Sequence, residues 1–227
     1  MKEETGESVS IEVHDAALEG VLRVPDEAEG TVLFACANHH RSPQVTFLAN
    51  LLPQNSLATV QFDLLTLAED ALYEDRLNLQ LLTDRLARVA GWAKGQPGLD
   101  DLPLGLFGIG TSGTAALELA ASLRHEISAV VVWHGRPDLA EQLLGFVTAP
   151  TLLIVGGNDD LVRKLNEQVF QKLHVEKDLV VIPGATHSFE EPGALQAVGE
   201  KAADWFSNYM AFAGAGAVAG RSGRTRA

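Results

Sequence analysis

The sequence predicts an α/β fold: a doubly wound, mostly parallel sheet of about eight strands with helices on both faces. Short, continuously apolar segments alternate along the chain with longer segments in which apolar residues recur every three or four positions. This is the pattern of buried parallel strands and amphipathic helices. Two segments near the N-terminus instead alternate between apolar and polar residues, which is typical of an antiparallel hairpin at a sheet edge.

The individual elements can be placed in order along the chain. The N-terminal hairpin is expected at residues 8–14 and 18–24, followed by strands at 31–37, 58–62, 104–108, 129–133, 151–155 and 178–182. The clearest helix is expected at 76–94, where leucine, valine and alanine recur at helical spacing, and another apolar stripe runs from Leu195 to Tyr209. These stripes predict packing against the sheet and carry no chemistry.

Composition limits the class of protein. With 227 residues, of which 46% are hydrophobic, the chain is long enough for one large core, so we expect a single domain over residues 1–212. The net charge of −13 disfavours nucleic acid and anionic membrane surfaces as partners. The single cysteine, Cys36, excludes an intramolecular disulfide. No signal-peptide pattern or membrane-spanning run is present, so a cytoplasmic location is expected.

The last segment of the chain differs from the rest. Residues 213–227 are rich in glycine and alanine and contain three arginines. Low complexity of this kind predicts a disordered tail outside the domain.

Residues that directly follow the strands are the candidates for function, because parallel α/β sheets bind ligands at the carboxyl ends of their strands. The candidates at this edge are Cys36, Ala37, Asn38, His39, His40, Gly110, Thr111, Ser112, His134, Arg136, Asp159 and His187. A turn, then an acid, then a histidine in chain order matches the order of a Ser-Asp-His triad in which the serine lies on a strand-to-helix turn.

The strand-to-helix junction within residues 104–117 is the most informative of these places. In the G-x-S-x-G elbow the central side chain is the nucleophile, and small residues flank it so that the turn can be tight. Counted from Gly108, this chain reads G-I-G-T-S, so Gly110 stands at the centre and the serine, Ser112, comes two residues later. A glycine cannot attack a carbonyl.

Several motifs together resemble the dienelactone hydrolase-like branch of the α/β-hydrolase superfamily. They are FDLLT at 62–66, LFG at 106–108, GRPDL at 135–139, APTLLIVGG at 149–157 with Asp159, and PGATH at 183–187 with EEPG at 190–193. The resemblance covers residues 31–206 and implies an α/β-hydrolase fold with Asp159 as the triad acid and His187 as the base. It also implies hydrolysis of a small ester or lactone through a serine or cysteine nucleophile, without a cofactor.

The sequence departs from this family at two catalytic places. Gly110 replaces the nucleophile, and the loop expected to supply an oxyanion-hole N–H, which includes Ala37 and Asn38, is altered and shorter. Ser112 is the best candidate for a displaced nucleophile, and the alternative interpretation is an ordinary residue of the first helical turn. Thr111 is expected to donate its backbone N–H rather than its hydroxyl.

The remaining candidates have plain alternatives. His39, His40 and His134 could hold a zinc-like ion with a nucleophilic water, but no helical spacing supports this and no metal is expected. Cys36 is a minor candidate for a reactive thiol. Arg136 either binds an anionic substrate or pairs with Asp138.

Three hypotheses remain open. The chain is a hydrolase of small esters or lactones that uses an unusual nucleophile, a catalytically inactive protein that keeps the pocket for binding or scaffolding, or, remotely, a metal-assisted hydrolase. The oligomeric state is not predicted.

Overall fold

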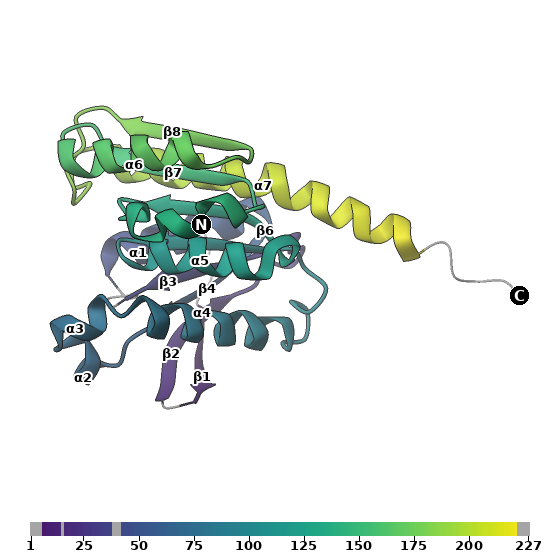
Figure 1. Cartoon of the computed structure of the whole chain (residues 1–227). Helices are drawn as coiled ribbons and strands as arrows, with labels where there is room; N and C mark the ends of the chain where they lie inside the picture. The colour runs from purple at the N-terminus through teal and green to yellow at the C-terminus, as the bar shows by residue number, and fades with distance from the viewer. Residues whose placement is uncertain (1–5, 15, 38–41, 222–227) are drawn as a thin grey trace, which may run out of the picture.

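A computed structural model describes residues 6–14, 16–37 and 42–221. Eight strands form one twisted sheet in the order β1-β2-β4-β3-β5-β6-β7-β8 (Figure 1). The strands are β1 (Glu7–Val13), β2 (Ala16–Arg23), β3 (Gly30–Cys36), β4 (Leu57–Asp63), β5 (Leu104–Ile109), β6 (Ile127–Trp133), β7 (Thr151–Gly156) and β8 (Lys177–Ile182). The β1 and β2 strands pair antiparallel, β2 joins β4 antiparallel, and the other pairs are parallel. The predicted fold class is confirmed, with strand limits that differ by one or two residues.

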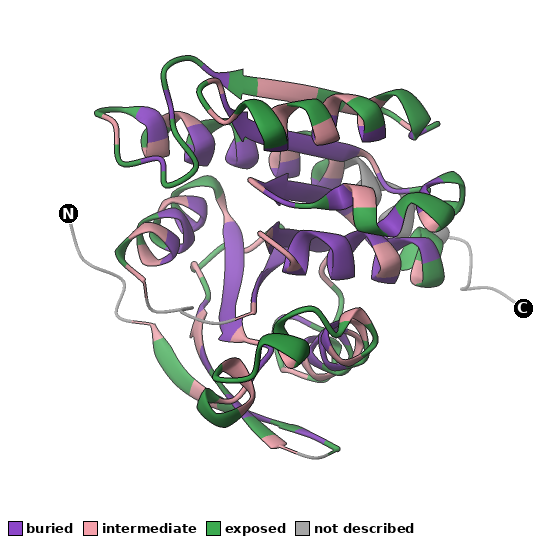
Figure 2. Ribbon diagram, turned by 60° about the vertical axis from the view of Figure 1, so that its left-hand side comes forward, coloured by how far each residue is buried: buried purple, intermediate pink, exposed green. Residues whose placement is uncertain are grey.

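Helices cover both faces of this sheet. They are α1 (Pro43–Leu51), α2 (Leu67–Asp70), α3 (Tyr73–Arg76), α4 (Leu79–Lys94), α5 (Ser112–Leu123), α6 (Asp160–Lys172) and α7 (Ala194–Arg221), with 3₁₀ segments η1 (Leu52–Asn55), η2 (Arg124–Glu126) and η3 (Pro137–Phe146). Successive side chains of a strand point to opposite faces. In β3, therefore, Leu33 and Ala35 pack in the cluster with α4 and α5, whereas Val32 and Phe34 pack with α1 and α7. Figure 2 shows the central strands buried between these two layers.

Two helix boundaries differ from the sequence-based expectation. Helix α4 begins at Leu79 rather than at residue 76, because the Asn78 side chain accepts a hydrogen bond from the Leu81 N–H and caps the helix there. Helix α7 continues to Arg221 and so enters the segment expected to be a disordered tail. The alanines in this segment favour helix. Residues 222–227 of the predicted tail lie outside the described residues.

Helix α7 is the longest helix, and its C-terminal part extends beyond the sheet in Figure 1. A membrane-spanning helix needs about 20 predominantly apolar residues. Among the residues that the structure describes, no helix has both the length and the apolar character to cross a membrane.

The short helix α2 is held over the carboxyl edge by a partly buried ion pair. Arg85 of α4, whose side chain is 2% exposed, contacts both carboxylate oxygens of Glu69 at 2.7 Å. Arg85 also donates to the Leu64 carbonyl. The Glu69 carboxylate accepts from the N–H and the hydroxyl of Thr66, which closes a capping box. These hydrogen bonds, chiefly the one from Arg85, lower the pKa of Glu69 to about 2.

Strand β5 passes into helix α5 with very little room between them. A Cβ added to Gly108 would lie 2.5 Å from the Cα of Gly113 and 2.8 Å from the carbonyl oxygen of Ser112. Both contacts are with backbone, which cannot move aside as a flexible side chain could. The junction therefore requires glycine at residue 108.

The variant Gly108→Ala tests this close approach. We expect it to lower the free energy of unfolding by about 2–3 kcal/mol, because the methyl group forces the strand and the helix apart. Gly91→Ala is the matched control, since Gly91 lies inside α4 and a Cβ there would meet nothing within 4 Å. Alanine at that position should raise the stability by about 0.5–1 kcal/mol. Urea denaturation measures both, and equal effects of the two variants would contradict the close-packed junction.

The ion pair of Glu69 predicts a pH-dependent difference between Glu69→Gln and the parent. Because the pKa of Glu69 is lowered on folding, its contribution is present above about pH 4.5 and is lost as the pH falls towards about 2. We expect the variant to be less stable than the parent by about 3 kcal/mol at pH 7, because the buried Arg85 loses its counter-charge.

This difference should shrink as both proteins are titrated into acid, which denaturant titrations at several pH values measure. The exposed Glu74 of α3 provides the control variant Glu74→Gln. A stability difference between Glu69→Gln and the parent that is independent of pH would contradict the lowered pKa of Glu69.

Candidate functional site

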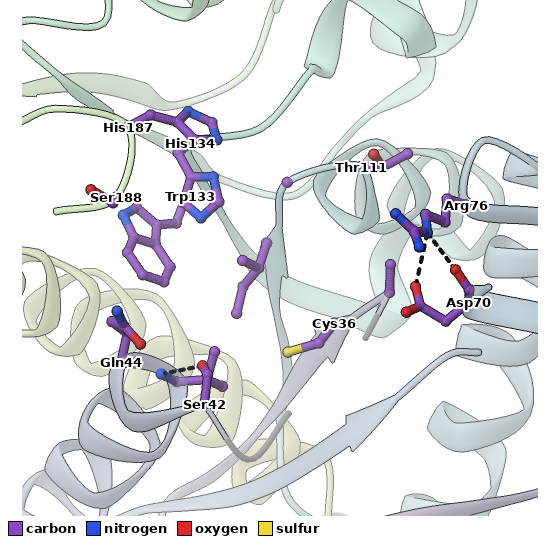
Figure 3. A pocket seen from close by; sticks show the side chains of 14 residues that line it. Cys36, Ser42, Gln44, Asp70, Arg76, Thr111, Trp133, His134, His187 and Ser188 are labelled. Carbon is purple, nitrogen blue, oxygen red and sulfur yellow. Dashed lines mark hydrogen bonds and ion pairs between the residues drawn. The ribbon is translucent and has the colours of Figure 1, made fainter. Parts of the chain in front are cut away.

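A cavity of about 460 Å³ opens at the carboxyl edge of the sheet. The following residues line it: Cys36, Ala37, Ser42, Gln44, Val45, Asp70, Arg76, Ile109, Gly110, Thr111, Trp133, His134, His187 and Ser188. In Figure 3 the rings of Trp133, His134 and His187 lie on one side of it, and Asp70 and Arg76 lie on the other. The cavity therefore lies at the edge where the sequence places the candidate residues.

Gly110 forms the turn between β5 and α5. Its φ of +58° lies in the left-handed region, which glycine adopts far more readily than other residues. Its N–H donates to the Trp133 carbonyl, which ties the turn to the end of β6. Apart from its chain neighbours, a Cβ added to Gly110 would meet one atom of the described residues within 4 Å, His134 Cε1 at 3.9 Å. A side chain at residue 110 would thus have room, whereas a side chain at residue 108 would collide with the backbone.

The two residues after Gly110 differ in their access to the cavity. Thr111 lines the cavity and lies directly before the first residue of α5. Ser112 is fully buried, is not among the lining residues, and its Oγ has no hydrogen-bond partner in the described part of the chain. The structure therefore does not bring Ser112 together with His187 in this cavity. The reason is the helical turn, which directs residue 112 into the core behind the turn.

Asp159 and His187 come together as a hydrogen-bonded pair. The Nδ1 atom of His187 lies 2.7 Å from Oδ2 of Asp159, while Oδ1 of Asp159 accepts from the Val162 N–H at the start of α6. The Asp159 side chain is 14% exposed and that of His187 is 60% exposed. A carboxylate in this position orients the imidazole and favours the tautomer with its proton on Nδ1, so that Nε2 is the basic nitrogen.

Backbone contacts between two loops hold this pair. The loop after β7, which carries Asp159, donates from Gly157 to the Ile182 carbonyl and from Asn158 to the Ala185 carbonyl. The Asn158 side chain also donates to the Gly184 carbonyl. A Cβ on Gly156 would lie only 2.6 Å from the Ala185 carbonyl oxygen, so the loops approach as closely as glycine permits. His187 is thereby placed by its loop as well as by its carboxylate partner.

His134 forms the wall between Gly110 and His187. It directly follows β6 and has a φ of +40°, which is uncommon for a residue with a side chain. Its ring lies edge-on to that of His187, with 4.7 Å between centroids. Burial, followed by the neighbouring His187, lowers the pKa of His134 to about 4. The ring is therefore uncharged at neutral pH. Its Nδ1 is buried with no hydrogen-bond partner among the described residues.

The other candidates occupy less central positions. Cys36 and Ala37 line the cavity, but Cys36 is 2% exposed, and burial, together with the nearby Asp63, raises the pKa of its thiol well above its usual value. A thiol of this kind is mostly protonated and unreactive at neutral pH. Asn38, His39 and His40 lie outside the described residues.

Arg136 adopts the second of its two predicted roles. Its guanidinium forms two hydrogen bonds with the Asp138 carboxylate, at 2.8 and 2.9 Å, and it is not a lining residue. Thr114 of α5 donates to its carbonyl, so the backbone of Arg136 supports the same junction.

Sequence reasoning missed part of the cavity wall. Asp70 and Arg76 belong to α2 and α3, which follow β4, and they form an ion pair at 3.1 Å. The sequence offered one signal for them, since they follow β4 in the chain. Nothing in the hydrophobic pattern shows that α2 and α3 lie over the carboxyl edge of the sheet. Ser42 and Gln44, at the start of α1, had no comparable signal.

The described residues contain no group of three or more histidine, cysteine, aspartate or glutamate side chains arranged to hold a metal ion. His134 and His187 contact each other through their rings, with Asp159 bound to His187. The remote expectation of a metal site depended also on His39 and His40, which lie outside the described part.

Known proteins match this chain over most of its length. The model of the dienelactone hydrolase family matches residues 56–214. A dienelactone hydrolase from Anabaena variabilis is 42% identical, with a TM-score of 0.86 over 92% of this chain and 100% of that one. The protein Est1E from Butyrivibrio proteoclasticus shares the fold at 16% identity, with a TM-score of 0.78 over 91% of this chain and 99% of that one.

Two proteins of Mycobacterium tuberculosis, named provisionally as phosphoribosyl transferases, are 41% identical over 206 residues, or 90% of this chain. This chain spans 46% of their length, so it corresponds to about half of each. The family match covers the β5–α5 turn, the Asp159 loop and the His187 loop. The chain belongs to the dienelactone hydrolase family.

Proposed function

We propose that this protein binds a small ester or lactone in the cavity at the carboxyl edge and that it does not form an acyl-enzyme with its ligand. The observation that carries the proposal is the turn at Gly110. Its left-handed φ and open Cβ direction match what an elbow nucleophile needs, yet the residue has no side chain. An acyl-enzyme requires a side-chain nucleophile.

Neighbouring nucleophiles do not take over this role. Ser112 is completely buried with its hydroxyl away from the cavity lining. Cys36 lines the cavity, but the raised pKa of its thiol disfavours the reactive thiolate. Thr111 follows Gly110 and lines the cavity, and the backbone N–H of the residue after the turn suits a carbonyl oxygen.

The rest of the cavity suits an uncharged or weakly polar carbonyl compound, because the charged residues of α2 and α3 that line it are paired with each other. Trp133, Ile109 and Val45 supply apolar surface, and the neutral His134 adds a polar group without charge. A volume of about 460 Å³ lies within the range of small-molecule sites. The net charge of −13 supports a small molecule rather than nucleic acid as the partner.

The variant Gly110→Ser tests this function by supplying the missing nucleophile. We expect the parent not to react with a fluorophosphonate probe, and Gly110→Ser to be labelled at residue 110, because the new Oγ would extend into the cavity that His187 lines. Hydrolysis of p-nitrophenyl acetate by Gly110→Ser should exceed that by the parent at least about 100-fold. Intact mass and absorbance at the p-nitrophenolate band measure both.

Ser112→Ala is the control for a displaced nucleophile. It should behave as the parent in both assays. Labelling of the parent that maps to Ser112, together with loss of activity in Ser112→Ala, would overturn the proposal and restore the displaced-nucleophile hypothesis.

A further inference from the structure

The side-chain position of Gly110 is open on the side of the cavity. Among the described residues other than its two chain neighbours, the one atom that an added Cβ would meet within 4 Å is His134 Cε1, at 3.9 Å. Gly110, His134 and His187 all line one cavity, whose volume of about 460 Å³ greatly exceeds the ~30 Å³ that a water molecule occupies in the liquid. Water can therefore enter the place that a nucleophilic side chain would fill.

A base for that water lines the same cavity. His187 keeps its carboxylate partner at 2.7 Å, which orients the ring and stabilises the imidazolium once a proton is taken up. Its side chain is 60% exposed, so solvent and ligand reach it. If the pair supported only the fold, such exposure would make it contribute little to stability.

The groups around this base leave it free to act. His134 contacts the His187 ring edge-on and is uncharged at neutral pH, so it neither repels the imidazolium strongly nor competes for the proton. Thr111 follows Gly110 and lines the cavity. The backbone N–H of the residue after an elbow turn suits a carbonyl oxygen. The base, the open position and the residue expected to supply the oxyanion donor thus all line one cavity.

We propose that a water molecule at Gly110 attacks the bound ester or lactone directly, with His187 as general base, so that hydrolysis takes place in one displacement. This inference rests on the proposed binding function. The water oxygen bonds to the acyl carbon while its proton passes to Nε2 of His187 and the carbonyl electrons move to oxygen. The carbonyl then re-forms, the bond to the leaving oxygen breaks, and His187 returns the proton to that oxygen. The products are an acid and an alcohol, or one hydroxy acid from a lactone.

The substrate class follows from the missing covalent step. General base catalysis by a positioned side chain contributes about 10²–10⁴-fold, less than a complete nucleophilic system. The reaction therefore suits strained lactones and esters with good leaving groups, whose acyl carbon water attacks readily. Amides and unactivated alkyl esters should bind without turnover.

The decisive variant is Gly110→Ala, which places a methyl group where the water attacks. With p-nitrophenyl acetate as substrate, we expect the parent to exceed buffer by at least about 100-fold, with no burst of p-nitrophenol. Gly110→Ala and His187→Gln should each lose this rate to within about threefold of buffer. Gly91→Ala and His125→Ala, which alter an exposed helix position and an exposed histidine, should retain it.

Binding is measured separately with 4-nitroacetanilide, an amide analogue of the substrate, by calorimetry on the same proteins. Parent, Gly110→Ala and His187→Gln should bind it with dissociation constants within about fivefold, and their melting curves should show that all are folded. His187→Gln keeps the test valid if Gly110→Ala does not fold, because glutamine replaces an exposed side chain.

The outcomes separate the two proposals. If the analogue does not bind the parent, the proposed binding function fails, and this inference fails with it. If the analogue binds but the parent does not exceed buffer, or keeps its rate in Gly110→Ala or His187→Gln, attack by water at Gly110 is wrong while the binding function stands. A burst in the parent would show an acyl-enzyme and overturn both.

Discussion

Strand β5 and helix α5 meet so closely that a Cβ at Gly108 would lie 2.5 Å from the Cα of Gly113. This approach forces the chain to reverse within the residues between them, and the left-handed φ of Gly110 is the result. The turn is held from the other side as well, since the Gly110 N–H donates to Trp133 and a Cβ on Gly135 would lie 3.0 Å from the Gly110 carbonyl oxygen. The backbone therefore fixes the direction in which a side chain at residue 110 would point.

The same constraint explains why Gly110 and Ser112 behave differently. The tight turn leaves residues 110 and 111 at the cavity, and the helix that follows at once directs residue 112 towards the core. Ser112 begins α5 and is fully buried, although it is only two residues away. On the opposite side of the cavity, the contacts between the β7 and β8 loops keep Asp159 and His187 together. Backbone contacts thus hold the turn at Gly110 and the pair of Asp159 with His187 in place without a nucleophilic side chain.

Periodicity predicted the fold well because both faces of the sheet are covered, so buried strands appear as continuous apolar runs. The loops after β7 and β8 could also be predicted to converge, because parallel strands end at one edge. The burial of Ser112 could not be predicted from its distance to Gly110. Residues two apart lie on the same face of a strand, but they lie on different faces of a helix. The positions of Asp70 and Arg76 depend on α2, which Glu69 ties to Arg85 across 16 residues of sequence. Helix α3 is joined to α2 by the ion pair of Asp70 with Arg76. The extension of α7 reflects the helix propensity of alanine. The prediction of a disordered tail considered only the low complexity of the segment and not this propensity.

The turn at Gly110 keeps the shape of an elbow, and we propose that no side chain of the protein is acylated. Mass spectrometry of the parent, quenched in acid within milliseconds of mixing with excess p-nitrophenyl acetate, tests it most directly. We expect only the unmodified chain at every time point. A transient species heavier by one acetyl group, formed and lost at the rate of turnover, would contradict it.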